Sequence, residues 1–297
     1  MNVNKPQNWL VTGGAGFIGS NFVRYALDTY PNVRITVLDN FSYAGNRRNL
    51  PSLEESSGRV EVFEGDVTDG ALAASLVPDC DVVYHFAAET HVTRSLYDSA
   101  SFVRTDVLGT HSILTACSLL TNPPLLVHIS TSEVYGSAEH PLMSEEHPLN
   151  PMSPYAGAKA GADRLVYAFH QAYGLPCVIL RPFNNFGPLQ HLEKLLPRFI
   201  TSALRDEPLN IHGAGIARRD YCFVEDTCRA IDAARRVITD EKPFEVFNVA
   251  SGRDHAIKEL AQLVVEMVSG STSEFRFIKD RPGQVLRHTG DSTRLNT

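Results

Sequence analysis

The sequence contains no long apolar run and no paired cysteines. No stretch approaches the roughly 18 consecutive apolar residues that a membrane helix needs, and residues 1–8 lack the apolar core of a signal peptide. The 5 cysteines form no C-x-x-C pair and the 11 histidines show no ligand spacing, which argues against a disulfide framework and a dedicated metal site. These absences predict a cytoplasmic chain with no membrane partner and no metal.

An excess of basic charge is also missing. Lys and Arg total 27 against 34 Asp and Glu, a net charge of −7, so the molecule repels polyanions and nucleic acid is not expected as a partner. The sequence does have length and apolar content. Its 297 residues are 43% hydrophobic, which suffices for one large or two modest domains.

Short β-branched runs alternate with amphipathic stretches through the first part of the chain. The runs predict buried strands at residues 9–12, 34–39, 60–64, 81–86, 125–130 and 177–181. Alternation of strands with helices predicts an α/β fold built on a doubly wound parallel Rossmann sheet, with helices on both faces.

The spacing of the elements loosens after Arg181, where a connection bearing proline and glycine follows. We therefore expect residues 1–181 to form the Rossmann domain and residues 182–297 to form a smaller mixed C-terminal substrate domain. Segments near 225–250 can return to the large sheet, so the boundary between the domains need not be a single cut.

A glycine-rich loop follows the first strand and opens a helix. In this G-x-x-G-x-x-G pattern Gly13 permits a tight turn, Gly16 lets the backbone approach a pyrophosphate, and Gly19 lets helix and strand pack closely. A glycine-rich turn without a ligand is the alternative. Asp39, which ends the second strand, favours NAD, because its carboxylate can accept hydrogen bonds from ribose hydroxyls and repels a 2′-phosphate.

Three residues near this loop keep a second interpretation. Asp66, after the third strand, can bind an adenine amino group or cap the helix that begins near residue 69. Arg47 and Arg48 can serve a phosphate, so the preference for NAD over NADP is not absolute.

Tyr155 and Lys159 lie four residues apart, after Ser153 and Pro154, which suit the N-cap and first position of a helix. This spacing places both side chains on one helix face. We expect the ammonium to lower the phenol's pKa from ~10, so that tyrosine can remove a hydroxyl proton. An ordinary exposed pair is the alternative.

The fifth strand ends in a run of polar residues at the edge where doubly wound sheets bind ligands. Thr131 supplies a hydroxyl there and Glu133 supplies a base. Their position favours catalysis by Tyr155 and Lys159 over the ordinary exposed pair.

These residues resemble the extended short-chain dehydrogenase/reductases that act on nucleotide sugars, and within them the dTDP-glucose 4,6-dehydratases. The resemblance covers nearly the whole chain. Its motifs are the glycine loop, residues 38–46, Gly65-Asp66-Val67, residues 87–95, residues 131–136, Tyr155-x-x-x-Lys159, Asn184-Asn185-Phe186-Gly187-Pro188, Glu193-Lys194-Leu195-Leu196-Pro197, Arg219-Asp220-Tyr221 and Arg281-Pro282-Gly283. The glycine loop and the Tyr-Lys pair mark only the superfamily, whereas the Tyr-Ala-Gly-Asn, Ala-Glu-x-His-Val, Asn-Asn-x-Gly-Pro and Glu-Lys-Leu segments are typical of the dehydratases.

The resemblance implies an NAD-dependent nucleotide-diphosphohexose 4,6-dehydratase, a lyase that gives a 4-keto-6-deoxy sugar. It makes Tyr155 the base for the sugar 4-hydroxyl, Lys159 its partner and a ribose ligand, and Thr131 a hydrogen-bonding aid. Glu133 becomes the base that removes the C5 proton. The cofactor-binding residues that it implies are Gly13, Gly16, Phe17, Ile18, Gly19, Asp39, Asn40, Asp66, Val67, Ala87, Tyr155 and Lys159.

One catalytic position departs from the family. Members usually carry aspartate before the glutamate, as the acid that protonates the leaving 6-hydroxyl, whereas this chain has Ser132, a far poorer acid. The Thr-Ser-Glu order also resembles GDP-mannose 4,6-dehydratases, in which case Glu133 returns its own proton, and UDP-glucuronate decarboxylases. A nucleotide-sugar 4-epimerase, a decarboxylase and a non-catalytic NAD(H)-binding regulator stay open as alternatives.

For the substrate, a nucleoside-diphosphate sugar, the resemblance implies a set of ligands in both parts of the chain. They are His91, Asn185, Glu193, Lys194, Arg219 and Arg287. His91 can instead be a satisfied core histidine, and each charged residue a surface ion pair. Family members read Arg-Pro-Gly-His-Asp-x-Arg-Tyr from position 281, where this chain has Gln284, Val285 and His288.

The resemblance further implies a homodimer in which helices near 99–120 and 155–173 form a four-helix bundle. Apolar residues on more than one helix face, such as Leu165, Val166 and Phe169, give weak support from pattern. Relatives continue through a further helix, so we expect this chain to lack the family's final helix.

Overall fold

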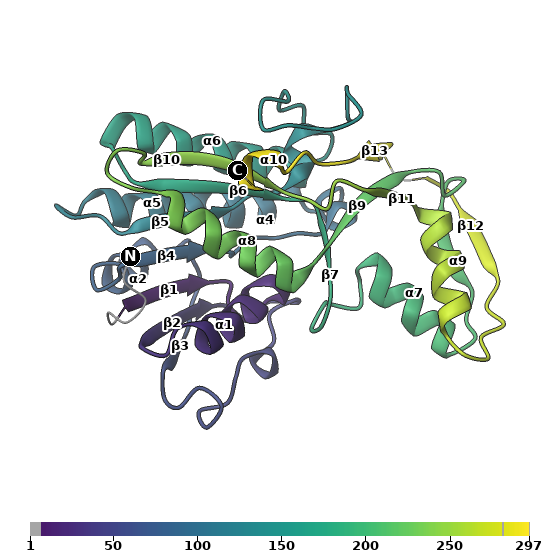
Figure 1. Cartoon of the computed structure of the whole chain (residues 1–297), viewed down its shortest axis with the longest axis horizontal. Helices are drawn as coiled ribbons and strands as arrows, with labels where there is room; N and C mark the ends of the chain where they lie inside the picture. The colour runs from purple at the N-terminus through teal and green to yellow at the C-terminus, as the bar shows by residue number, and fades with distance from the viewer. Residues whose placement is uncertain (1–6, 281, 297) are drawn as a thin grey trace.

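The structure, a computed structural model, describes residues 7–280 and 282–296. Residues 1–6, at the start of the segment considered as a signal peptide, and Arg281 of the Arg281-Pro282-Gly283 motif lie outside these ranges. Within the described residues the largest element is a seven-stranded sheet in the order β10-β6-β5-β4-β1-β2-β3 (Figure 1). Its strands are β1 (Gln7–Thr12), β2 (Val33–Asp39), β3 (Val60–Glu64), β4 (Val82–His85), β5 (Leu125–Ile129), β6 (Cys177–Pro182) and β10 (Phe244–Val249). All neighbouring strands run parallel, which confirms the predicted doubly wound sheet.

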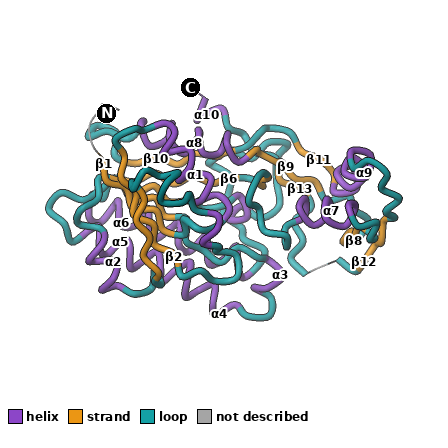
Figure 2. Tube along the Cα trace, turned by 90° about the horizontal axis from the view of Figure 1, so that it is seen from below, coloured by secondary structure: helices purple, strands orange, loops and turns teal. Residues whose placement is uncertain are grey.

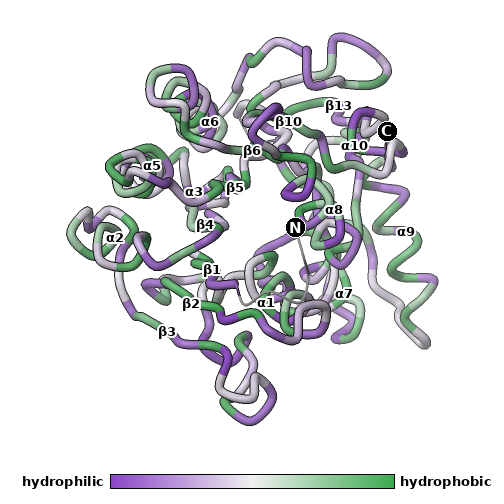
Figure 3. Tube along the Cα trace, turned by 60° about the vertical axis from the view of Figure 1, so that its left-hand side comes forward, coloured by the Kyte–Doolittle hydropathy of each residue, from purple (hydrophilic) through white to green (hydrophobic). Residues whose placement is uncertain are grey.

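Helices cover both faces of this sheet (Figure 3). One face carries α1 (Phe17–Thr29) and α8 (Val224–Val237), and the other carries α2 (Gly70–Leu76), α5 (Thr110–Ser118) and α6 (Pro154–Tyr173). The strands alternate between the two cores: Trp9 and Val11 of β1 belong to the first and Leu10 to the second. Burial on both faces explains why the central strands β4 and β5 are mostly apolar.

The helix expected near 99–120 changes its winding along its length. It consists of α4 (Ser99–Phe102), the π-helical η2 (Val103–Gly109) and α5, and η2 holds the buried Asp106. The short elements α3 (Val92–Ser95), η1 (Arg47–Asn49) and η3 (Ser132–Tyr135) lie in the connections. π-Helical turns are rare and occur mostly at functional sites, and η2 packs against α6, the helix of Tyr155 and Lys159.

The second part of the chain extends away from the large sheet (Figures 1 and 2). Its elements are β7 (Asn184–Phe186), α7 (Leu195–Leu204), β8 (Leu209–His212), β9 (Arg218–Phe223), β11 (Asp254–Ala256), α9 (Ile257–Met267), β12 (Phe275–Ile278) and β13 (Arg287–His288). The last helix, α10 (Thr293–Asn296), instead packs against β10 and α8 beside the large sheet (Figure 1). Strand β9 pairs with β7, β11 and β13, and β8 pairs with β12. The helices α7 and α9 share an apolar core with β8, and α9 alternates between hydrophobic and hydrophilic residues (Figure 3).

The chain passes between the two parts more than once. After β9, α8 packs beside α1 and β10 pairs with β6 at the edge of the large sheet. None of the helices in residues 7–280 and 282–296 has the length and apolar character needed to cross a membrane.

Candidate active site

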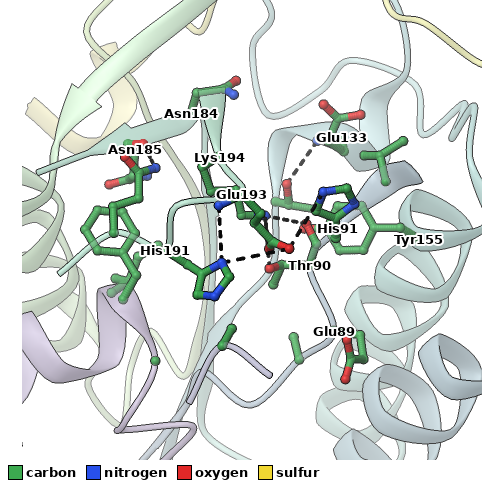
Figure 4. A pocket seen from close by; sticks show the side chains of 18 of the residues that line it. Glu89, Thr90, His91, Glu133, Tyr155, Asn184, Asn185, His191, Glu193 and Lys194 are labelled. Atoms are coloured by element: carbon green, nitrogen blue, oxygen red, sulfur yellow. Dashed lines mark hydrogen bonds and ion pairs between the residues drawn. The ribbon is translucent and has the colours of Figure 1, made fainter. Parts of the chain in front are cut away.

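A cavity of about 640 Å³ lies between the carboxyl edge of the large sheet and the second part of the chain. Its walls come from the β1–α1 loop, the ends of β2, β4 and β5, the start of α6 and segments around 182–199 and 210–221. Figure 4 shows part of it, with Glu133 and Tyr155 on one side and Asn184, Asn185 and His191 on the other. Doubly wound sheets bind their ligands at this edge.

The glycine loop in this cavity leaves no room for side chains. Gly13 has a φ of +68°, and its N–H donates to the Leu38 carbonyl at 2.8 Å. A Cβ on Gly13 would lie 2.6 Å from the Ala87 nitrogen, and one on Gly19 would lie 2.4 Å from the Gly13 oxygen. Gly16 caps the amino end of α1 without a side-chain hydrogen bond, so this end of the helix can hold a phosphate with its backbone amides. The loop fits a dinucleotide pyrophosphate.

Asp39 stands next to this loop. It is 7% exposed, and its two carboxylate oxygens accept hydrogen bonds from the Ala15 and Phe41 amides at 2.9 and 2.8 Å. Burial raises the pKa of Asp39, and these two amides counter that shift. Each oxygen keeps a second lone pair, so Asp39 can still bind ribose hydroxyls.

The remaining predicted cofactor ligands divide into two groups. Phe17, Ile18, Asn40, Val67 and Ala87 line the cavity together with the glycines. Asp66 is not among the lining residues; its carboxylate accepts hydrogen bonds from the Thr68 amide and hydroxyl, both at 2.8 Å. The capping alternative for Asp66 is wrong, because the N-cap of α2 is Asp69; adenine binding by Asp66 stays a prediction.

Helix α6 places Tyr155 and Lys159 in the cavity wall. Ser153 caps the helix by accepting a hydrogen bond from the Ala156 amide at 3.1 Å, and Pro154 is its first residue. Burial raises the pKa of Tyr155, and a hydrogen bond with Thr131 lowers it by less. The expected lowering of this pKa by Lys159 is wrong for this structure, because the lysine Nζ donates instead to the Ile129 carbonyl at 2.7 Å.

Glu133 lies in η3, directly after β5. The Thr131 hydroxyl caps this short helix by accepting a hydrogen bond from the Glu133 amide at 3.2 Å (Figure 4). Thr131, Ser132 and Glu133 all line the cavity, and the Glu133 side chain is 18% exposed. Behind it, Nδ1 of the buried His288 lies 3.8 Å from the carboxylate oxygen Oε1.

Two of the predicted substrate ligands, His91 and Glu193, meet in the cavity wall. His91 Nε2 lies 3.7 Å from Glu193 Oε2, and the Lys194 ammonium donates to the Thr90 carbonyl at 2.8 Å (Figure 4). His91 is therefore part of the cavity wall and not a core histidine. These contacts join the segment after β4 to the segment before α7.

The other three predicted substrate ligands differ in position. Asn185 and Arg219 line the cavity and are both largely buried. Arg287 does not line it: its Nε donates to Asp254 Oδ2 at 2.7 Å, and its side chain is 46% exposed. Arg287 thus forms an ion pair with Asp254, and its role as a substrate ligand stays a prediction.

Tyr43, Glu89 and His191 also line the cavity, although the motif analysis gave them no role. Burial raises the pKa of Tyr43 to about 12, with Glu193 adding to the effect, and the Arg94 guanidinium lies 3.6 Å above its ring. Tyr43 and Glu89 belong to motifs that resemble the family, so the sequence could have identified them as residues of the site. His191 lies outside them, and only the tertiary structure brings it to the site.

The doubly wound sheet, the glycine loop and the Tyr-x-x-x-Lys pair in one cavity define a dinucleotide-binding enzyme of the short-chain dehydrogenase/reductase class. The chain belongs to the GDP-mannose 4,6 dehydratase family, whose model matches residues 10–295.

Curated relatives narrow the similarity further. The chain is 43% identical to the low-salt glycan biosynthesis protein Agl12 of Haloferax volcanii, over 96% of this chain and 90% of that protein. It is 40% identical to a dTDP-glucose 4,6-dehydratase of Streptomyces niveus, over 97% of this chain and 85% of the relative. Both similarities extend through both parts of the chain.

Solved structures also show the similarity to dTDP-glucose 4,6-dehydratases. DesIV of Streptomyces venezuelae, a dTDP-glucose 4,6-dehydratase crystallised with NAD, superimposes with a TM-score of 0.91 at 38% identity, covering 97% of this chain and 89% of DesIV. A UDP-glucose 4-epimerase of Thermotoga maritima superimposes with a TM-score of 0.87 at 28% identity, over 97% and 90% of the two chains. The fold is thus shared with epimerases, whereas the sequence is more similar to these dehydratases.

Proposed function

We propose that the chain is an NAD-dependent nucleotide-diphosphohexose 4,6-dehydratase. The observation that carries the proposal is that Tyr155, Thr131 and Glu133 line one cavity together with the glycine loop. A 4,6-dehydratase needs a base at the sugar 4-hydroxyl and a second base at C5, both close to a nicotinamide. The relatives named dTDP-glucose 4,6-dehydratase support the same reaction.

NAD, when bound, accepts hydride from C4 and later returns it to C6. The glycine loop, Asp39 and Lys159 are the residues proposed to hold it. Tyr155 accepts the proton of the 4-hydroxyl, and Thr131 is placed to hydrogen-bond the same oxygen. Because burial raises the pKa of the phenol, it needs a positive charge nearby to act as a base. Lys159, one turn further along α6, donates to the Ile129 carbonyl in this structure, and it is proposed to supply that charge once NAD is bound.

Glu133 is proposed to carry out the elimination. A ketone at C4 acidifies the C5 proton, which the Glu133 carboxylate removes. The electron pair of the broken C5–H bond forms the C5=C6 double bond while the C6–O bond breaks. The proton on Glu133 then passes to the departing oxygen, so that water leaves. Hydride at C6 and a proton taken from solvent at C5 complete the 4-keto-6-deoxy sugar, while Tyr155 releases to solvent the proton that it took from the 4-hydroxyl.

The second part of the chain is proposed to bind the nucleoside diphosphate, while residues 1–181 bind NAD. Arg219 on β9 and Lys194 before α7 place positive charge in the cavity, which suits phosphate oxygens. Because several relatives are named for dTDP-glucose, dTDP-glucose is the first substrate to test.

The test is to incubate the protein with dTDP-glucose, GDP-mannose, UDP-glucose and UDP-glucuronate and to determine the product masses. Loss of water from a hexose is the expected result. Loss of carbon dioxide would identify a decarboxylase, and an isomer of unchanged mass would identify an epimerase. Binding of NAD without conversion of any sugar would indicate a regulator.

We also propose a cytoplasmic homodimer. The five cysteines, all among the described residues, are free thiols, which suits a reducing compartment. Val103 and Leu108 of η2 are exposed at 54 and 49%, and a second copy can cover such apolar side chains. Light scattering should give twice the chain mass, and a monomer at micromolar concentration would contradict the dimer.

A further inference from the structure

His288, which stands where the family has tyrosine, is buried directly behind Glu133. It lies on β13, which pairs with β9 so that His288 is opposite Arg219. Its side chain is fully buried, and its Nε2 lies 2.6 Å from the Gly136 carbonyl, three residues beyond Glu133. Gly136 has a φ of +72°, and a Cβ there would lie 2.0 Å from the Asn150 carbonyl oxygen. The position of the carbonyl that receives His288 is therefore firmly set.

This carbonyl decides the protonation of the ring. A carbonyl oxygen only accepts, so Nε2 of His288 carries the hydrogen and donates it. In the neutral ring Nδ1 then has a lone pair, and it makes no hydrogen bond with any described residue. The carboxylate oxygen Oε1 of Glu133 lies 3.8 Å from this nitrogen. A lone pair and an ionised carboxylate repel each other, so this pair becomes attractive when one proton lies between the two atoms.

The site needs a place for one proton. Ser132 cannot act as the acid for the leaving hydroxyl, so the proton that Glu133 removes from C5 has to remain on Glu133 until the C6–O bond breaks. We propose that His288 is the positioning residue that holds protonated Glu133, by accepting the carboxyl O–H at Nδ1, between removal of the C5 proton and departure of the 6-hydroxyl. This inference rests on the proposed dehydratase function and deepens it.

The step balances without any further reactant. The C5 proton moves to Glu133, the new O–H donates to Nδ1 of His288, and the same proton then transfers to the C6 oxygen as that bond breaks. The ring of His288 only accepts a hydrogen bond from this proton, which stays on Glu133, and the ring is unchanged at the end. The 3.8 Å separation is longer than a hydrogen bond, and such contacts often shorten when the substrate binds.

The charges around His288 keep the ring in its accepting form. Burial lowers the pKa of His288, and the positive charge of Arg219 on β9 and the nearby His147 lower it further, whereas Glu133 and the Gly136 carbonyl raise it. Because the pKa is lowered overall, the ring loses its accepting lone pair only at pH values below the ordinary histidine pKa of about 6.5. The elimination step is therefore expected to fail on the acidic side.

The experiment compares His288→Gln with His147→Gln, a buried histidine nearby that hydrogen-bonds the Pro148 carbonyl and the Glu139 amide. The wild-type protein and both variants are mixed with dTDP-glucose in single-turnover experiments across pH. Absorbance of reduced nicotinamide reports oxidation at C4, and product mass reports loss of water. The mechanism predicts that His288→Gln forms reduced nicotinamide at the wild-type rate, accumulates it, and loses water at least about tenfold more slowly.

The pH profile and a rescue distinguish positioning from packing. The pH dependence of the water-loss rate should change in His288→Gln, and also in His288→Tyr, which keeps a buried ring in case the glutamine variant fails to bind NAD. Replacing Ser132 with aspartate in the His288→Gln background should restore water loss, because that variant has its own acid. His147→Gln should keep the wild-type rates of C4 oxidation and water loss near neutral pH.

Several results would overturn the proposal. One is that both His288 variants lose water at the wild-type rate and with an unchanged pH profile. Another is that the variants slow C4 oxidation and water loss equally. A third is that Ser132→Asp fails to restore water loss in the His288→Gln background, which would show that His288 does not act by holding the proton on Glu133. If the wild-type protein itself dehydrates no nucleotide sugar, the proposed function fails and the role of His288 fails with it. If the wild-type protein dehydrates the sugar and the His288 variants do so equally well, only the role of His288 fails.

Discussion

At the scale of single residues, the chemistry depends on groups whose surroundings change their protonation. Burial raises the pKa of Tyr155 and lowers that of Lys159, so both are less ionised in this structure than free side chains. The spacing in the sequence predicts that the two share a helix face, but the depth of burial depends on the packing of α6 against η2.

Replacing Tyr155 with phenylalanine removes the proposed base and leaves the packing of the ring. We expect reduction of NAD by dTDP-glucose to slow by about 10²- to 10⁴-fold, the usual contribution of acid–base catalysis. Stopped-flow absorbance of reduced nicotinamide measures it. Unchanged reduction kinetics with intact NAD binding would reject the role of Tyr155.

Glu133→Gln tests the second base separately. This variant should still bind NAD and reduce it with dTDP-glucose, but exchange of the C5 hydrogen with deuterated solvent should stop, because an amide cannot remove that proton. Mass spectrometry of recovered sugar measures the exchange. Retained exchange at the wild-type rate would show that another group is the base.

Gly19→Ala tests the cofactor loop. The added Cβ would lie 2.4 Å from the Gly13 oxygen and 2.9 Å from the Gly14 Cα, both backbone atoms, so the loop must move, at a cost of about 1–3 kcal/mol. We expect weaker NAD binding and a lower melting temperature. Gly70→Ala is the control, because a Cβ there meets no atom within 4 Å; equal losses in both variants would contradict the steric argument.

At the scale of elements, a buried ion pair ties α6 to the large sheet. Both carboxylate oxygens of Asp163 accept hydrogen bonds from the Arg181 guanidinium of β6, at 2.9 Å each, and Ser130 donates to the same carboxylate at 2.8 Å. Asp163 is fully buried, and although burial alone raises its pKa, its arginine partners lower the pKa overall. The catalytic helix thus has a fixed position relative to the end of β5.

Asp163→Asn leaves the Arg181 charge buried without its counterion and should destabilise the fold by about 3–5 kcal/mol near neutral pH. Because the folded pKa of Asp163 is lowered, its contribution is complete above the unfolded value of about 3.9 and is lost as pH falls through the folded pKa. The difference between variant and wild type in urea unfolding should therefore shrink on acidification below about pH 4. A difference that does not depend on pH would argue against an ionised carboxylate.

At the scale of the whole molecule, the cavity is completed only where the two parts of the chain meet. Lys194, which precedes α7, reaches across to the Thr90 carbonyl and hydroxyl after β4, at 2.8 and 3.2 Å. This contact joins segments 104 positions apart in the sequence. The substrate half of the cavity therefore depends on the relative placement of both parts.

Lys194→Met removes a charged donor and should raise KM for dTDP-glucose by about 10- to 100-fold, the effect of losing a charge-assisted hydrogen bond. NAD affinity should stay unchanged, because the cofactor site lies in the first part. Steady-state kinetics and NAD titration measure the two effects. Lys258→Met, on α9 and outside the cavity wall, is the charge-matched control; an equal effect there would indicate a general loss of charge.

The strands, the glycine loop and the Tyr-x-x-x-Lys pair could be predicted from sequence because each depends on local pattern. The apolar runs at 9–12 and 34–39 predict strands buried on both faces. A glycine-rich loop between a strand and a helix is typical of dinucleotide binding. The predictions that need contacts between distant segments were weaker. Arg287 follows a motif that resembles the family, yet its guanidinium is paired with Asp254, 33 positions away, which the motif does not reveal.

The sequence by itself determined the parallel sheet, the dinucleotide loop and the chemical types at the catalytic positions, since helix and strand periods and short spacings are properties of neighbouring residues. Only the tertiary structure decided the direction in which the pKa of Tyr155 shifts, the hydrogen bond between Lys194 and Thr90, and the place of His288 behind Glu133. These depend on burial and on contacts across 100 or more positions, and burial and distant contacts arise only when the chain has packed.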